Sequence, residues 1–209
     1  VGKTLSYDDL KEQGYRGIFV ASGAGLPRFM DIPGENYIGV MSSNEYLTRV
    51  NLMGAGRQGW KTPVIKGKRV AVIGGGNTAM DSCRTARRMG AEEVYIVYRR
   101  SEAEMPARVE EVHHAKQEGV TFLTLHNPVE YLADENGRVR AMRLQRMELG
   151  EPDASGRRSP VPVEGDIVEV PVDEVIVSVG VSPNPLIPST IPGLETTRRG
   201  TIVADEATL

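Results

Sequence analysis

The chain has 209 residues, 40% of them hydrophobic, which is enough to bury the core of one large domain or of one domain with flanking parts of another. Its net charge of -3 at pH 7 argues against a nucleic-acid partner, because proteins that bind nucleic acid usually carry an excess of basic residues. No apolar run approaches the roughly 18 residues that span a bilayer, and no signal segment opens the chain, so the sequence predicts a cytoplasmic protein without a membrane partner.

The N-terminal third of the chain contains one strand-like and one helix-like pattern. Residues 17–21 form a short apolar run closed by Ser22 and Gly23, which predicts a buried strand. A loop rich in glycine and proline follows. A helix is then predicted over about 44–53, capped by Ser42 or Ser43, before a connector over 54–63.

From residue 68 the pattern is typical of alternating strands and helices. The continuous apolar run 70–73 predicts a strand buried on both faces of a parallel sheet. A glycine-rich turn follows, and then a helix over about 77–89 and a strand over 94–98. A second helix over about 106–118 and a third strand over 121–125 continue the series.

After residue 125 an antiparallel meander is predicted where another helix would be expected. Asn136-Gly137 separates two strand patterns, and this dipeptide is a strong hairpin signal. A second turn is predicted over 153–158. Further strands are predicted at 129–133, 138–147, 167–170, 174–179 and 201–204.

The glycine-rich turn matches the dinucleotide-binding pattern GxGxxG/A. Gly74 would form the tight turn, Gly76 would let the backbone approach a pyrophosphate, and Ala79 would keep the helix close to the strand. The first N–H groups of the helix would bind the phosphates. The alternative is a turn whose glycines only permit packing. The residues predicted to bind the cofactor here are Gly74, Gly75, Gly76, Asn77, Thr78, Ala79 and Asp81.

The end of the second strand indicates which dinucleotide binds. NAD sites usually hold an acidic residue there, whereas the 2'-phosphate of NADP needs positive charge. This strand ends in Arg99 and Arg100, and arginine binds phosphate in a bidentate way. The two residues therefore favour NADP(H). The alternatives are that both are solvated surface residues, or that Glu102 and Glu104 neutralise them.

No metal site and no catalytic residue is predicted. His113 and His114 are adjacent on one helix and face different directions, whereas helical metal ligands sit three or four residues apart. The single cysteine, Cys83, excludes a disulfide framework and an iron-sulfur cluster ligated only by this chain. Any redox chemistry would therefore use an organic cofactor.

The sequence resembles the small (beta) subunit of NADPH-dependent glutamate synthase. The resemblance rests on the run from Gly74 to Asp81, on Val97-Tyr98-Arg99-Arg100, on Glu104-Met105-Pro106-Ala107 and on the segment 44–53. Related sequences are the matching subunit of ferredoxin:NADP oxidoreductase and the pyridine-nucleotide region of dihydropyrimidine dehydrogenase.

The resemblance implies a flavoprotein in which an NADPH domain is inserted into an FAD domain. Ser22 and Gly23 are similar to the first crossing between these domains, with Ser22 where threonine is usual, and Gly180 is similar to the return crossing. The resemblance implies that these three residues also bind a cofactor. The first FAD fingerprint of the family is absent from these residues. We therefore expect this chain not to hold FAD firmly, and we expect the iron-sulfur clusters to lie outside it.

Together these patterns predict an α/β fold, with a Rossmann-like three-layer NAD(P)-binding domain, an antiparallel β-meander and partial strands of an FAD domain on both sides. The expected divisions are residues 1–25 for the FAD domain and crossover, 26–66 for a connector, 67–182 for the NADPH domain and 183–209 for the return segment.

The resemblance also implies the function. NADPH would pass hydride to FAD, and electrons would continue through iron-sulfur centres to a partner large subunit for glutamate synthesis. We expect this chain to be inactive alone. Two alternatives stay open: a subunit that passes the electrons to ferredoxin, and a non-catalytic domain that senses the nucleotide.

Overall fold

The computed structural model describes residues 4–152, 154, 156, 158–205 and 207. The chain divides into two compact units. The first, here called the sheet unit, runs from Arg28 to Val179, and the second, the terminal unit, takes the N-terminal part up to Pro27 and the C-terminal part from Gly180.

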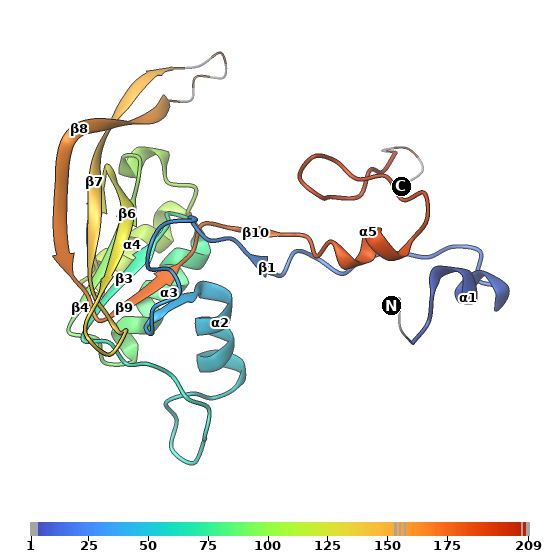
Figure 1. Ribbon diagram of the computed structural model, residues 1–209, viewed down its shortest axis with the longest axis horizontal. Helices are drawn as coiled ribbons and strands as arrows, with labels where there is room; N and C mark the ends of the chain where they lie inside the picture. Colours follow the sequence, from blue (N-terminus) through green and yellow to red (C-terminus); the bar gives the residue numbers. More distant parts are fainter. Residues whose placement is uncertain (1–3, 153, 155, 157, 206, 208–209) are drawn as a thin grey trace. The chain divides into compact units, whose positions relative to one another are not determined.

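A parallel sheet of five strands forms the centre of the sheet unit (Figure 1). Its strands are built from apolar runs, and Val70, Val72 and Ile176 are at most 1% exposed because layers cover both faces. In spatial order the strands are β2 (Val40–Ser42), β9 (Glu174–Val177), β3 (Arg69–Ile73), β4 (Glu93–Tyr98) and β5 (Thr121–Thr124). The predicted strands at 70–73, 94–98, 121–125 and 174–179 all belong to this sheet.

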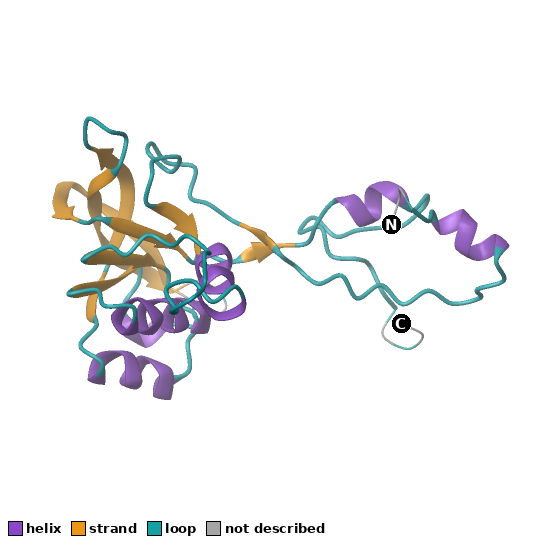
Figure 2. Cartoon of the chain, turned by 90° about the horizontal axis from the view of Figure 1, so that it is seen from below, coloured by secondary structure: helices purple, strands orange, loops and turns teal. Residues whose placement is uncertain are grey.

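Helices cover one face of this sheet (Figure 2). They are α2 (Ser43–Leu47), α3 (Asn77–Arg88) and α4 (Val109–Gln117). The helix α3 turns Ala79, Met80 and Cys83 into the core, where each has no exposed area. Among the described residues, no helix has the length and apolar character that crossing a membrane requires.

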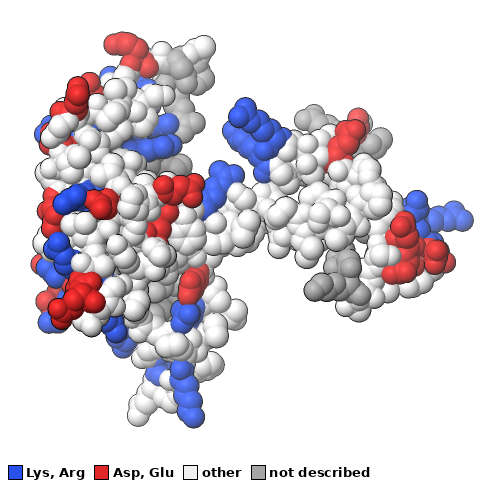
Figure 3. Space-filling view, in the orientation of Figure 1, with Lys and Arg blue, Asp and Glu red and all other residues white. Residues whose placement is uncertain are grey.

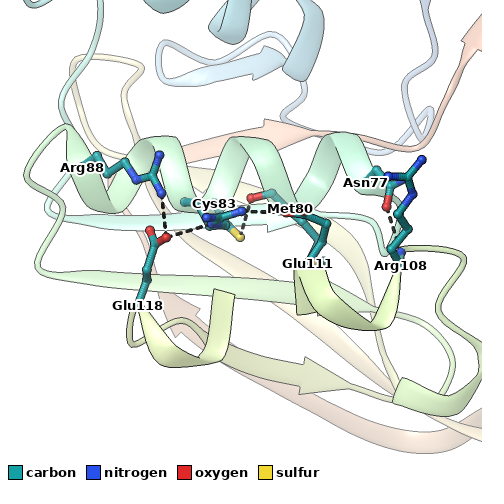
Figure 4. Close-up of polar contacts among 8 residues, drawn as sticks. Asn77, Met80, Cys83, Arg88, Arg108, Glu111 and Glu118 are labelled. Carbon is teal, nitrogen blue, oxygen red and sulfur yellow. Dashed lines mark hydrogen bonds and ion pairs between the residues drawn. The ribbon is translucent and has the colours of Figure 1, made fainter. Parts of the chain in front are cut away.

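Ion pairs fix α4 against α3 on the outer side of this layer (Figure 4). The guanidinium of Arg84 donates to Glu111 at 2.6 Å and to Glu118 at 2.9 Å, and Arg88 donates to Glu118 at 2.7 Å. The bonds from Arg88 and Arg84 hold the pKa of Glu118 below its usual value. The segment that connects β4 to α4 is thereby held at its far end.

An antiparallel meander covers the other face of the sheet. It consists of β6 (His126–Ala133), β7 (Val139–Pro152) and β8 (Arg158–Pro171). Tyr131, Met142 and Leu144 are buried in the core that it shares with the sheet. This arrangement confirms the predicted three-layer fold with a meander. The predicted turn at 153–158 lies partly outside the described residues, since Asp153, Ser155 and Arg157 are not among them.

Two short segments begin or end differently from the prediction. The expected helix at 44–53 is α2 followed by a π-helical turn, η1 (Thr48–Leu52), and Ser42 is its cap, accepting from the Glu45 N–H at 3.2 Å. The helix expected from residue 106 begins at Val109, because a 3₁₀ turn, η2 (Glu102–Glu104), and an extended segment come first.

The terminal unit contains short elements: α1 (Tyr7–Glu12), α5 (Leu186–Thr190) and the paired strands β1 (Leu26–Pro27) and β10 (Val181–Ser182). The predicted strand at 17–21 is wrong. These residues are not in a strand, and Phe19 is 92% exposed. An apolar run needs a neighbouring strand to pair its backbone, and no described residue pairs with this one. The predicted strand at 201–204 is reduced to a single bridge between Thr196 and Ile202.

Candidate functional site

The glycine turn lies where the direction of the sheet connections reverses. The chain moves from β3 through α3 to β4 on one side, whereas β9 lies on the other side of β3. Crevices at such reversal points, beside the carboxyl ends of the strands, are where α/β sheets bind ligands. Gly74 follows β3 and Ser178 follows β9, so both residues lie at this edge.

Close packing explains two of the three glycines in the turn. A Cβ on Gly74 would lie 2.3 Å from the carbonyl oxygen of Ser178, and Gly74 has a φ of +136°. A Cβ on Gly75 would lie 2.8 Å from the ring of Tyr98. These two positions therefore need glycine whether or not a ligand binds.

Gly76 needs a different explanation. A Cβ at this position would have no atom within 4 Å, and its φ of -91° is open to any residue. Gly76 is also the N-cap of α3, and no side chain bonds the first N–H groups of the helix. The space beside Gly76 and the N–H groups of α3 are what a bound phosphate requires.

The first turn of α3 presents both buried and exposed side chains. Ala79 is fully buried against the sheet, as predicted for the position that keeps helix and strand close. Asn77, Thr78 and Asp81 are exposed. The side-chain oxygen of Asn77 accepts the backbone N–H of Arg108 at 2.9 Å (Figure 4), so Asn77 holds a neighbouring loop in place.

That loop, residues 101–108, is fastened to the glycine turn. The Ala107 N–H donates to the Gly75 carbonyl at 3.1 Å, and the Tyr98 hydroxyl donates to the Glu104 carbonyl at 2.9 Å. Ser101 and Glu104 form a capping box. This clamp was not predicted from the sequence, although the pattern Ser-x-x-Glu is a known signal for the box.

Arg99 and Arg100 have different environments at the end of β4. Arg99 is exposed, whereas Arg100 is only 8% exposed and its Nε has no hydrogen-bond partner. Arg100 is therefore not a solvated surface residue. A buried guanidinium nitrogen without a partner is costly, and a bound anion would satisfy it.

The two nearby glutamates have other partners. Glu102 accepts from Lys116 at 2.6 Å, and Glu104 accepts from the backbone and hydroxyl of Ser101. Arg108, which the sequence analysis overlooked, adds a third arginine beside the turn, because its backbone is bonded to Asn77 and its side chain is exposed. The site is therefore locally basic in a chain with a net negative charge.

Ser22, Gly23 and Gly180 belong to the terminal unit. All three are exposed, and a Cβ on either glycine would have no atom within 4 Å. Among the described residues, no group of three or more His, Cys, Asp or Glu side chains could hold a metal ion.

One family model and several known proteins match almost the whole chain. The sequence profile described as pyridine nucleotide-disulphide oxidoreductase matches residues 2–208. The chain is 42% identical to the NADP(+)-dependent formate dehydrogenase subunit beta of Moorella thermoacetica, over 100% of this chain and 28% of that protein. It is also 42% identical to the NADPH-Fe(3+) oxidoreductase subunit beta of Geobacter sulfurreducens, over 97% of this chain and 29% of that protein.

A third relative is the glutamate synthase NADPH small chain of Halomonas elongata, with 37% identity over 99% of this chain and 43% of that protein. The chain thus spans less than half of the length of these relatives. Among solved structures, the Mycobacterium tuberculosis oxidoreductase FprA in complex with NADPH has a TM-score of 0.76 and 23% identity, over 98% of this chain and 57% of that one. At this identity the likeness concerns the fold.

Proposed function

Because the chain belongs to the pyridine nucleotide-disulphide oxidoreductase family, we propose that its glycine turn binds NADPH as the electron donor of a flavoprotein oxidoreductase. The observation that carries the choice of NADPH is Arg100, which is buried at the end of β4 with its Nε unpaired. The names of the relatives from M. thermoacetica, G. sulfurreducens and H. elongata agree with this choice.

Each part of the site has a role in this proposal. The N–H groups at the start of α3 and the space beside Gly76 hold the pyrophosphate. Arg100, with Arg99 at the surface, holds the 2'-phosphate. The clamp between the loop 101–108 and Gly75 fixes the distance between these two phosphate subsites.

When bound, NADPH supplies the hydride that reduces a flavin. The residues of this chain bind and orient the nucleotide, and none of them is needed as an acid, a base or a nucleophile. We propose that Ser22, Gly23 and Gly180 contribute to FAD binding in the whole enzyme, and that this chain alone does not hold FAD firmly. FAD and the iron-sulfur centres are proposed for the whole enzyme.

The glycine turn offers a matched pair of variants. Gly76→Ala should fold as stably as the parent, because the new methyl has open space, but it should weaken NADPH binding by roughly tenfold or more by filling the proposed phosphate site. Gly74→Ala should lose stability, because its methyl meets the Ser178 carbonyl at 2.3 Å. Thermal unfolding and calorimetric titration separate the two effects. Normal NADPH binding by Gly76→Ala would favour a turn that serves packing only.

The reduced flavin must pass its electrons to an acceptor. We propose glutamate synthesis with a large partner subunit, in line with the relative from H. elongata. In the assembled enzyme, NADPH oxidation should then depend on glutamine and 2-oxoglutarate. NADPH oxidation that responds instead to ferredoxin would assign the chain to the alternative oxidoreductase, and NADPH binding without any oxidation would assign it to a sensor.

A further inference from the structure

We propose that the loop 52–62, here called the docking loop, binds an acidic protein surface on the electron-accepting partner subunit. This inference rests on the proposed function for the identity of the partner. The loop begins at Leu52, the last residue of η1, and leads towards β3, and it projects from the lower end of the sheet unit in Figure 1. It contains none of the residues assigned to the nucleotide.

The docking loop exposes large apolar side chains. Leu52 is 78% exposed, Trp60 is 56% exposed and Met53 is 46% exposed. Tryptophan and arginine are enriched among the residues that carry the binding energy of protein interfaces. Three such apolar side chains within nine residues are a costly surface feature unless a partner covers them.

The docking loop contains no helix or strand after Leu52, the last residue of η1, but hydrogen bonds hold its two ends. Arg49 donates to the Pro63 carbonyl at 2.8 Å, and the Thr62 hydroxyl donates to the Met53 carbonyl at 2.7 Å, so both ends are tied together. The indole of Trp60 lies against Gly54, where a Cβ would be 2.4 Å from the ring. A side chain held in this way loses little further entropy on binding.

The charge around the loop indicates the chemistry of the partner. Between Glu45 and Asp81 the chain has no acidic residue, although its overall net charge is -3. Within this stretch Arg57, Lys61 and Lys66 make no ion pair with any residue that the structure describes. Figure 3 shows basic side chains at the end of the sheet unit where the loop projects. An acidic surface with an apolar pocket complements this combination.

The test uses the full-length protein purified with its own partner subunit. A carbodiimide cross-linker joins amines to carboxylates that touch, so Lys61 should be linked to an aspartate or glutamate of the partner. Trp60→Ala should raise the dissociation constant of the complex by about thirtyfold or more. Arg57→Glu with Lys61→Glu should weaken it at least about tenfold and reduce its dependence on salt.

A matched control reverses two charges on the meander, Arg138→Glu with Arg140→Glu, and should leave assembly unchanged. Reduction of ferricyanide by NADPH reports the nucleotide site separately and should be normal in every variant. Failure of the parent to reduce ferricyanide would overturn the proposed function without affecting the docking loop. Docking-loop variants that assemble as tightly as the parent would overturn this inference. It would also be overturned if the same variants instead lost self-association or binding to anionic lipid vesicles, or if the parent had no partner subunit.

Discussion

The double variant Arg99→Ala with Arg100→Ala should bind NADPH at least roughly a hundredfold more weakly than the parent and should keep its affinity for NADH. A hydrogen bond to a charged group contributes about 1.5–3 kcal/mol, so two arginines on one phosphate contribute several kcal/mol. NADH lacks the 2'-phosphate, so its affinity should not change. Calorimetric titration of both nucleotides measures the two affinities.

The single variants separate the two arginines. Arg100→Ala should have the larger effect, because Arg100 is 8% exposed whereas Arg99 is solvated. Arg138→Ala, at the hairpin turn of the meander, is a matched control that should leave both affinities unchanged. If the double variant lost NADPH and NADH equally, the arginines would support the fold of the site and would not select the phosphate.

Glu174→Gln should make the protein more stable than the parent at pH 8 but not at pH 4.5. Burial raises the pKa of Glu174 from 4.5 to about 7, although one oxygen accepts the Gly67 N–H at 3.0 Å. The other oxygen has no partner and the residue is 1% exposed. Ionisation of this carboxyl in the folded protein therefore costs free energy, which glutamine avoids while it can still accept from Gly67.

The direction of the pH effect follows from proton binding. Between pH 4.5 and about 7 the folded state holds the proton on Glu174 and the unfolded state does not, so the free energy of unfolding falls as the pH rises. The difference in the free energy of unfolding between Glu174→Gln and the parent should grow by about 2–3 kcal/mol over this interval. Urea unfolding at several pH values measures it. The control is Glu135→Gln in the exposed hairpin turn. If the free energy of unfolding of Glu174→Gln changed with pH in the same way as that of the parent, the raised pKa of Glu174 would be contradicted.

Local patterns in the sequence were sufficient to predict the layers of the sheet unit. The run 70–73 is apolar throughout because β3 is buried on both faces, and Asn136-Gly137 marks the hairpin between β6 and β7. The glycine turn could also be predicted, because its residues are contiguous in the sequence. The prediction that these residues and the two arginines bind a nucleotide remains to be tested by titration.

Features that depend on distant parts of the chain could not be predicted from local sequence patterns. The contact that requires glycine at Gly74 comes from Ser178, which follows β9 and lies far along the chain. The burial of Arg100 and Glu174 likewise depends on neighbouring strands and loops, and local sequence does not specify these. The prediction of a strand at 17–21 was wrong for the same reason, because a strand needs a partner and no described residue pairs with this segment.

If the site recognises the 2'-phosphate of NADPH, it must distinguish NADPH from NADH. Calorimetric titration of the unmodified full-length protein with NADPH and with NADH, at one ionic strength, tests it most directly. NADPH should bind at least about tenfold more tightly than NADH, since one charged hydrogen bond is enough for that ratio. Equal affinities for the two nucleotides would contradict it.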